Sequence, residues 1–310
     1  MHDRQVHGSH AIDINAVPAD SHSAREREGR SSAGLGNRLR YGFGTDVGLV
    51  RELNEDSFVA IAPVFAVADG MGGHEAGEVA SSICVRTLEA SSITAGTEPH
   101  VTVEYLEDLI DQVDQRIRSE AGGDAGTTLT GVVLVEESAA PHWLFFNVGD
   151  SRSYRLSSGT FGQISVDHSE VQELVDTGQL TEDEARTHPR RHVVTRALGA
   201  GDDTEADFWL LPVEDGDRLL LCSDGLSGEL TDDEICSILS IAAEPQEVCD
   251  ELIAAALRSG ARDNVTAIVV DAATREADDA ATPGAEDTTT TPFRGFFAAD
   301  GIGPAGWRRP

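Results

Sequence analysis

The stretch WLFFNVGDSRSYRL, residues 143–156, constrains the fold most, because it holds two strand-like runs with only a few turn residues between them. Parallel neighbours need a crossover of about a dozen residues or more, whereas a short turn can join antiparallel strands. Similar short runs rich in branched residues are typical of strands. They are VFAVAD (64–69), TLTGVVLV (128–135), RLLLCSD (218–224) and NVTAIVVD (264–271). The sequence therefore predicts largely antiparallel sheets.

Three helices are predicted where apolar residues recur at helical spacing. In the stretch 245–259 a proline stands at the first position and Gly260 follows the last, which is the usual placement of both residues around a helix. The other two helices are expected at 75–90 and 101–119. Helices combined with antiparallel strand pairs indicate the α+β class, with helices packed on the sheets.

The domain organisation follows from shifts in composition. The 310 residues have room for one sizeable domain, expected at 37–272. Residues 1–36 are rich in His, Ser, Arg, Asp and Gly without periodicity, and they are predicted to form a disordered leader. Residues 273–310 are predicted to form a disordered acidic Thr/Pro/Gly tail. The aromatic residues of that tail are a candidate docking peptide.

The charge narrows the choice of partners. The formal net charge is -32, from 55 acidic and 23 basic residues, and all of the basic residues are arginine. Such a surface repels nucleic acid and anionic lipid, so neither is an expected partner. The four cysteines lie far apart and are expected to be reduced core residues of a cytoplasmic protein. No run approaches the roughly 18 apolar residues of a membrane span, and a soluble monomer is expected.

The glycine-rich stretch GMGGHEAG first suggests a phosphate-binding loop. Gly72 and Gly77 have the spacing of such a loop, but the next two residues are not the required Lys and Ser or Thr. The dinucleotide pattern G-x-G-x-x-G from Gly70 also fails, because its last position is Glu75. Two interpretations of the preceding Asp69 remain: a simple Asp-Gly turn, or a carboxylate aimed at a cation.

Repetition favours the cation. Aspartates end three strand-like runs and stand just before a fourth, at Asp69, Asp150, Asp224 and Asp263. Strand ends that meet at one edge of a sheet would bring these carboxylates together, where their repulsion requires compensating cations. Oxygen ligands without a His or Cys cluster suit Mg²⁺ or Mn²⁺ rather than Zn²⁺. Two such ions can activate a bridging water for phosphoester hydrolysis.

The stretch RELNED allows two interpretations. It is a surface charge run with Asn54 as a helix cap, or it contributes to the site. In the second case Arg51 binds a phosphate bidentately and Asp56 joins the acidic cluster through a water. A serine nucleophile is not expected, because GDSRS lacks the final glycine of a nucleophile elbow. Among the histidines, His74 alone lies inside the glycine-rich stretch.

Seven ordered motifs resemble those of the bacterial metal-dependent Ser/Thr protein phosphatases of the PPM (PP2C-type) family. The resemblance runs from about residue 41 to 271 and rests on RELNED, VADGMGGHEAGEVAS, GTTLTGVVL, NVGDSRSY, SVDHSEVQELVDTGQLTEDEARTHPRRHVVTRALG, LLCSDGLSGEL and RDNVTAIVV. It implies a four-layer α-β-β-α sandwich with two central, mainly antiparallel sheets. It also implies two Mn²⁺ or Mg²⁺ ions, and a weaker third ion, at one end of the sheets.

The resemblance assigns metal-binding roles by motif. It implies that Asp69 bridges the two ions, that the Gly70 carbonyl binds one of them, and that Asp224 and Asp263 complete the other. It further implies that Asp150 binds the third ion together with Asp224.

The resemblance also concerns substrate groups. It implies that Asp56 holds metal-bound waters and that Arg51 binds the substrate phosphate. Some members carry a general-acid His where this chain has Met71, so His74 is the matching candidate, with a metal-bound water as the alternative proton donor. The segment 168–199 resembles a mobile flap that influences substrate choice. Several bacterial relatives continue into a membrane helix, and the polar tail here predicts a member without one.

The implied function is hydrolysis of phosphoserine and phosphothreonine in proteins, by direct attack of a water activated by two metal ions. The implied partners are phosphorylated proteins and an opposing Hanks-type Ser/Thr kinase. Two alternatives remain open. One is a catalytically silent module of the same fold that binds phosphoproteins, and the other is an acidic interaction protein whose carboxylates form only a solvated face.

Overall fold

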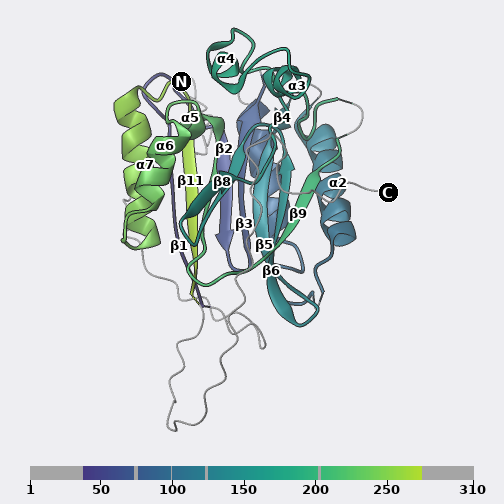
Figure 1. The fold of residues 1–310 in the computed structure, drawn as a ribbon. Helices are drawn as coiled ribbons and strands as arrows, with labels where there is room; N and C mark the ends of the chain where they lie inside the picture. Colours follow the sequence, from purple (N-terminus) through teal and green to yellow (C-terminus); the bar gives the residue numbers. More distant parts are fainter. Residues whose placement is uncertain (1–37, 73–75, 99, 123–124, 202–203, 274–310) are drawn as a thin grey trace, which may run out of the picture.

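A computed structural model describes most of the chain, and Figure 1 shows its fold. The predicted leader, and the predicted tail after its first residue, lie outside the described part, so both remain predictions. The same holds for His74. The described residues are 38–72, 76–98, 100–122, 125–201 and 204–273.

Two antiparallel sheets form the centre of the molecule. The first has the order β1 (Arg38–Asp46), β11 (Val265–Ala273), β10 (Arg218–Cys222), β7 (Arg152–Ser157) and β8 (Thr160–Gln163). The second has the order β2 (Asp56–Ile61), β3 (Val64–Met71), β5 (Leu129–Glu137), β6 (Ala140–Val148) and β9 (Asp207–Pro212), with β4 (Gly126–Thr127) paired to β3. Every pairing between these strands is antiparallel, as predicted.

Helices cover both outer faces, which gives the four layers visible in Figure 1. The second sheet is covered by α1 (Ala76–Glu89) and α2 (Val103–Glu120), and the first by α6 (Asp232–Leu239) and α7 (Pro245–Ser259). Three short helices lie at one end of the sheets: α3 (Glu170–Asp176), α4 (Glu182–Thr187) and α5 (Asp224–Ser227). The predicted α-β-β-α sandwich is confirmed. Among the described helices, none combines the length and the apolar composition needed to cross a bilayer.

Burial on both faces explains why the central strands read as continuous apolar runs. Along β3, Phe65 and Val67 point into the core between the sheets, while Ala66 and Ala68 pack under α1 and α2. The same alternation places Trp143 and Phe145 of β6 in the inner core. The prediction that the cysteines are core residues is confirmed for Cys84, Cys222 and Cys249, which are buried, and was wrong for Cys236, which is only partly buried.

Local signals set the helix ends. Thr231 and Thr181 begin α6 and α4 with complete capping boxes, in which each threonine and the glutamate three residues later bind each other's backbone amides. Gly260 ends α7 with φ of 123°, a conformation that favours glycine. The predicted bounds of α7 are therefore confirmed at both ends.

Several predicted strand ends were wrong by two residues, including those of β3, which continues past Asp69 to Met71, and of β6 and β10. β6 ends at Val148, because Gly149 turns the chain with φ of 102° beside Thr128. Asp150 therefore follows the strand in a turn, and Asp224 is the first residue of α5 rather than the last of β10. Both aspartates still lie two residues beyond the last residue of a strand, close to the sheet end that the metal hypothesis requires.

Candidate metal centre

In the second sheet, strand ends bring three of the predicted aspartates to one end. Asp56 at the start of β2 stands opposite Asp69 near the end of β3. Leu129, the first residue of β5, stands opposite Val148, the last residue of β6. Because Asp150 comes two residues after Val148, it lies beside the same end of the sheet.

The first sheet contributes two more aspartates at its corresponding end. Cys222, the last residue of β10, stands opposite Ala267 near the start of β11. Asp224 comes two residues after Cys222, and Asp263 comes two residues before the first residue of β11. Ser223 donates a hydrogen bond across to Asp56, so the two sets of strand ends adjoin. The structure therefore brings together the five aspartates that the sequence singled out.

Asp56 is buried where the two sheets meet. Its Oδ2 accepts hydrogen bonds from Ser223 Oγ at 2.8 Å and Thr266 Oγ1 at 2.7 Å. Its Oδ1 is buried and has no hydrogen-bond partner among the described residues. Burial, together with the charges of Asp224 and Asp263, raises the pKa of Asp56 to about 7 against the effect of these two hydrogen bonds. A carboxylate oxygen in this setting requires a proton or a cation.

Burial also raises the pKa of Asp69 well above its ordinary value, and repulsion from the other four aspartates adds to the shift. The pKa of Asp150 is raised in the same way, by burial first and then by Asp224 and Asp167. Shifts of this kind arise where carboxylates share a site without enough positive charge. The site is thus electrostatically incomplete in a manner that divalent cations would correct.

Gly70 is required here by close packing. A Cβ atom at this position would lie 2.2 Å from the Gly77 carbonyl oxygen and 2.6 Å from that of Glu55. The Gly70 amide donates a hydrogen bond of 3.1 Å to the Glu55 carbonyl. The absent side chain lets β3, the start of α1 and the loop before β2 meet beside the acidic cluster.

Arg51 lies at the edge of the cluster. Although it is expected to bind phosphate, its guanidinium is paired with the Asp263 carboxylate. Its Nη2 donates to Asp263 Oδ2 at 2.7 Å, and its Nη1 lies 3.8 Å from Glu55 Oε2. The hydrogen bond that Arg51 donates to Asp263 raises the pKa of Arg51. Burial raises the pKa of Glu55, whose Oε1 has no partner within the part of the chain that the structure describes.

Asn54 is not a helix cap, so the first interpretation of RELNED was wrong on this point. Its Nδ2 donates to Thr45 Oγ1 at 2.8 Å, and its Oδ1 accepts from the Asp56 amide at 3.1 Å. Both bonds shape the loop before β2. This loop therefore carries Arg51 and Glu55 to the carboxylate cluster.

The donor set fits ions that keep part of their water shell. Within the described ranges, no three His, Cys, Asp or Glu side chains are grouped closely enough to hold an ion by themselves. Mg²⁺ and similar hard ions usually retain several waters and use one or two carboxylates or carbonyls, so they do not need such a group. Aspartates that influence one another's charge without forming such a group match that mode better than a zinc site with four direct protein ligands.

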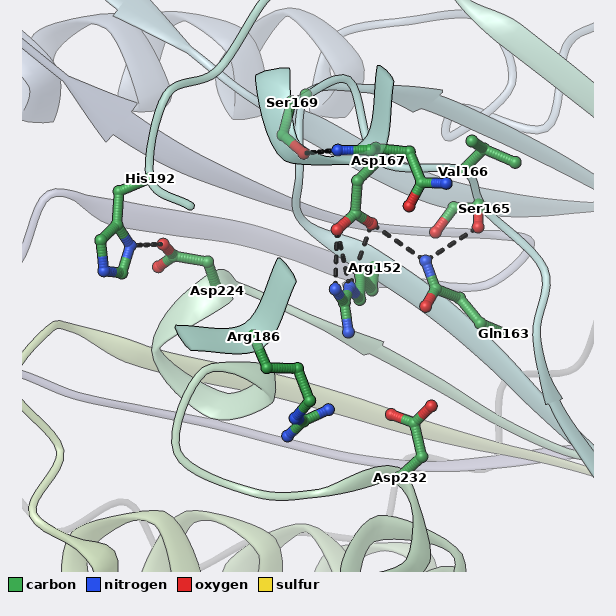
Figure 2. A network of polar contacts seen from close by, with 12 residues as sticks. Arg152, Gln163, Ser165, Val166, Asp167, Ser169, Arg186, His192, Asp224 and Asp232 are labelled. Atoms are coloured by element: carbon green, nitrogen blue, oxygen red, sulfur yellow. Dashed lines mark hydrogen bonds and ion pairs between the residues drawn. The ribbon is translucent and has the colours of Figure 1, made fainter. Parts of the chain in front are cut away.

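Sequence reasoning missed a set of polar contacts around the turn that carries Asp150, and Figure 2 shows one of them, between Arg152 and Asp167. Arg152 and Asp167 form a largely buried ion pair, with the shortest contact at 2.7 Å. His168 Nδ1 accepts from the Gly149 amide at 3.1 Å, and the His168 amide donates to the Gly149 carbonyl at 2.9 Å. The partners lie 15 and 19 positions apart in the sequence, and no local pattern links them.

The predicted flap, residues 168–199, contains α3 and α4 and lies at this end of the molecule (Figure 1). His192 Nδ1 lies 3.7 Å from Asp224 Oδ2, as Figure 2 shows. Thr127 and Leu198 exchange backbone hydrogen bonds of 2.9 Å, which fastens the end of the segment to β4. The flap therefore borders the carboxylate cluster directly.

Raised carboxyl pKa values predict how the stability of the metal-free protein depends on pH. The folded state keeps protons on Asp56, Asp69 and Asp150 that the unfolded chain releases near pH 4. The stability from these groups is complete below that pH and is lost as pH rises through their folded pKa values, near 7 for Asp56. Cations replace these protons, so Mn²⁺ should raise the melting temperature more at pH 8 than at pH 5.5.

Differential scanning fluorimetry with Mn²⁺ or with chelator at both pH values measures this difference. The chelated sample corrects for all other titrating groups at each pH. A manganese-induced shift in melting temperature that is equal at the two pH values, or absent from both, contradicts the prediction.

Comparisons with known proteins agree with the motifs. The family model described as Protein phosphatase 2C matches residues 51–263. Serine/threonine protein phosphatase PstP of Mycobacterium tuberculosis is 40% identical over 247 residues, which are 75% of this chain and 45% of PstP. The chain thus spans less than half the length of PstP. Serine/threonine phosphatase stp of Listeria monocytogenes is 36% identical over 243 residues, which are 74% of this chain and 94% of that protein.

Solved structures show the same fold. The crystal structure of the PstP catalytic domain in complex with two manganese ions has a TM-score of 0.69 and 37% identity, and covers 76% of this chain and 99% of that one. Phosphatase Stp1 from Staphylococcus aureus has a TM-score of 0.69 and 32% identity, and covers 79% of this chain and 99% of that one. The resemblance drawn from the seven motifs is confirmed, and the chain belongs to the protein phosphatase 2C family.

Proposed function

We propose that this protein is a metal-dependent serine/threonine protein phosphatase. The carboxylate cluster carries the proposal, because five aspartates from both sheets converge on one end of the sandwich and Asp56 keeps a buried oxygen without a partner among the described residues. The named activity of the bacterial relatives supports it, as do the two manganese ions in the PstP catalytic domain.

The proposed roles are those that the family resemblance implies, and the oxygen donors are of the kind that these ions prefer. Asp69, the Gly70 carbonyl, Asp224 and Asp263 would hold two Mn²⁺ or Mg²⁺ ions, and Asp150 with Asp224 a weaker third. Asp56, whose Oδ2 is fixed by two hydroxyl groups, would orient water with Oδ1. When bound, such ions act as Lewis acids that activate water for direct attack on phosphorus.

Arg51 is the proposed phosphate-binding residue. Its guanidinium is about half exposed and spends one donor on Asp263, so its remaining donors can meet a phosphate at the cluster. His74 remains the proposed general acid, with water as the alternative donor. The sequence, rather than the described residues, supports that assignment.

The proposed substrates are phosphorylated proteins, including those of an opposing Hanks-type kinase. A net charge of -32 disfavours nucleic acid and anionic membranes as partners. We propose that the protein acts as a monomer in the cytoplasm.

Hydrolysis of a phosphothreonine peptide tests the proposal. The full chain should release phosphate with Mn²⁺, lose this activity on chelation and regain it when Mn²⁺ is restored. Phosphate release that is indifferent to chelator contradicts the metal-dependent mechanism. Tight binding of the phosphopeptide without turnover at saturating Mn²⁺ would instead identify a silent binding module.

A further inference from the structure

A basic strip interrupts the acidic surface next to the carboxylate cluster. We define it as residues 185–201, which run from α4 toward β9 and contain no acidic residue. Four of the 23 basic residues of the chain, all arginine, fall within these positions, although the net charge of the chain is -32. They are Arg186, Arg190, Arg191 and Arg196.

Contacts place the strip at the proposed active site. The Nδ1 atom of His192 lies 3.7 Å from Oδ2 of Asp224, the first residue of α5. Figure 2 marks this contact with a dashed line. Arg186 donates to the Leu230 carbonyl at 3.3 Å, just beyond α5, and lies below Asp224 in the same view. A peptide whose phosphate reaches the cluster therefore passes beside this strip.

The four arginines divide into two pairs. Arg190 forms an ion pair with Glu170, and Arg196 contacts Asp207 and His168, so these two fix the strip to its surroundings. Arg186 is exposed and spends one donor on Leu230. The Arg191 side chain has no partner among the residues that the structure describes. Two guanidinium groups thus keep donors for an external anion.

We propose that Arg186 and Arg191 bind anionic groups that flank the phosphorylated residue of the substrate, so that acidic phosphopeptides are the preferred class. This inference rests on the proposed phosphatase function. Guanidinium groups bind carboxylates and phosphates bidentately, so the anion is an Asp or Glu side chain or a second phosphate. The surrounding acidic surface repels such peptides, which makes the strip their favourable approach.

Steady-state kinetics of the full manganese-loaded chain test the inference with three phosphothreonine peptides. One has Asp and Glu flanks, one has a second phosphothreonine, and one has uncharged flanks. Substituting both Arg186→Gln and Arg191→Gln should lower kcat/KM on the preferred anionic peptide about tenfold, mainly through KM, because two surface charge pairs are lost. The uncharged peptide should change less than about twofold, and about 0.5 M salt should remove the difference. The anionic peptide whose kcat/KM falls more in the double variant shows whether the strip binds carboxylates or a second phosphate.

The matched control is Arg258→Gln on α7, an exposed arginine paired with Glu251. Equal losses on charged and uncharged peptides, or wild-type protein without preference for either anionic peptide, overturn the inference while leaving the phosphatase proposal intact. If no peptide is hydrolysed, the phosphatase proposal fails. Fluorescence anisotropy then tests the role of the strip separately, by comparing how tightly the acidic peptide binds the wild type and the double variant. Equal affinity for the two proteins overturns the inference.

Discussion

Replacing Asp69 with asparagine is expected to lower manganese-dependent phosphatase activity by about a thousandfold or more. Asp69 is the proposed ligand of both ions, and such a shared ligand supports several kcal/mol of transition-state stabilisation. The same substitution should raise the melting temperature of the metal-free protein. The charged form of Asp69 is disfavoured by burial and by repulsion from Asp56, Asp224, Asp150 and Asp263. A neutral amide at this position removes both free-energy costs. Phosphate release and thermal unfolding of chelated protein measure the two effects.

Lower activity combined with a higher melting temperature identifies a residue of the metal site, because loss of a residue that only supports the fold would lower both quantities. Asp111→Asn on the exposed face of α2 is the matched control and should leave both quantities unchanged. Activity within about tenfold of wild type in the Asp69 variant would contradict the proposed role of this carboxylate. A lower melting temperature of that variant without metal would contradict the electrostatic explanation of the site.

Substituting Asp217 with alanine is expected to lower the free energy of unfolding by about 3–5 kcal/mol, because it removes the buried carboxylate that pairs with Arg155. The largely buried guanidinium is then left with the Pro212 carbonyl and with Glu214, whose Oε1 lies 4.0 Å away. The fully buried Asp217 accepts hydrogen bonds from Arg155 Nε at 3.0 Å and Nη2 at 2.9 Å, and from Trp143 Nε1 at 2.9 Å. Its Oδ2 also accepts from the Glu214 amide at 2.9 Å. Urea unfolding measures the loss, which corresponds to roughly 10 °C in melting temperature for a domain of this size.

Metal binding is the control for this second substitution. Asp217 precedes β10, whereas the aspartate cluster lies beyond the other end of that strand. Manganese affinity of the folded variant should therefore match the wild type, and Asp111→Ala should leave stability within about 0.5 kcal/mol. A loss below about 1 kcal/mol, or weakened metal binding at unchanged stability, contradicts this structural role.

The sequence revealed the central strands but not the edge strands. Strands β3, β5, β6, β7, β10 and β11 are interior to their sheets and were all predicted. The strands at the four edges, β1, β2, β8 and β9, were missed. The edge strands β1 and β8 contain glycines and polar residues that weaken the apolar pattern. In β1, a Cβ at Gly42 would lie 2.3 Å from Gln246 Cα, so glycine lets α7 pack closely there.

The residues of the candidate site could be predicted from the sequence, but the contacts between them could not. The aspartates could be identified because each stands next to an apolar run, so a local pattern combined with strand pairing was sufficient. The contacts of Ser223 and Thr266 with Asp56 could not, since they join residues 167 and 210 positions apart and depend on how the two sheets stack. The Arg51 pairing with Asp263, 212 positions away, was unpredictable for the same reason.

The short helices show what local signals could have added. Threonine followed three residues later by glutamate occurs at Thr181 and Thr231, and both positions begin helices with capping boxes. These boxes would have placed α4 inside the flap and α6 on the outer layer. The arrangement of α4 beside Asp224 would still have required the tertiary structure.

Calorimetric titration of Mn²⁺ into the metal-free full chain at pH 7.5 tests the central claim most directly. If the five aspartates form a metal centre, wild-type protein binds at least two ions, and the Asp69→Asn variant loses at least one of them while remaining folded. Protons should be released on binding, because Mn²⁺ displaces them from carboxyl groups with raised pKa values. Absence of saturable Mn²⁺ binding, or equal binding by the variant, would contradict the claim.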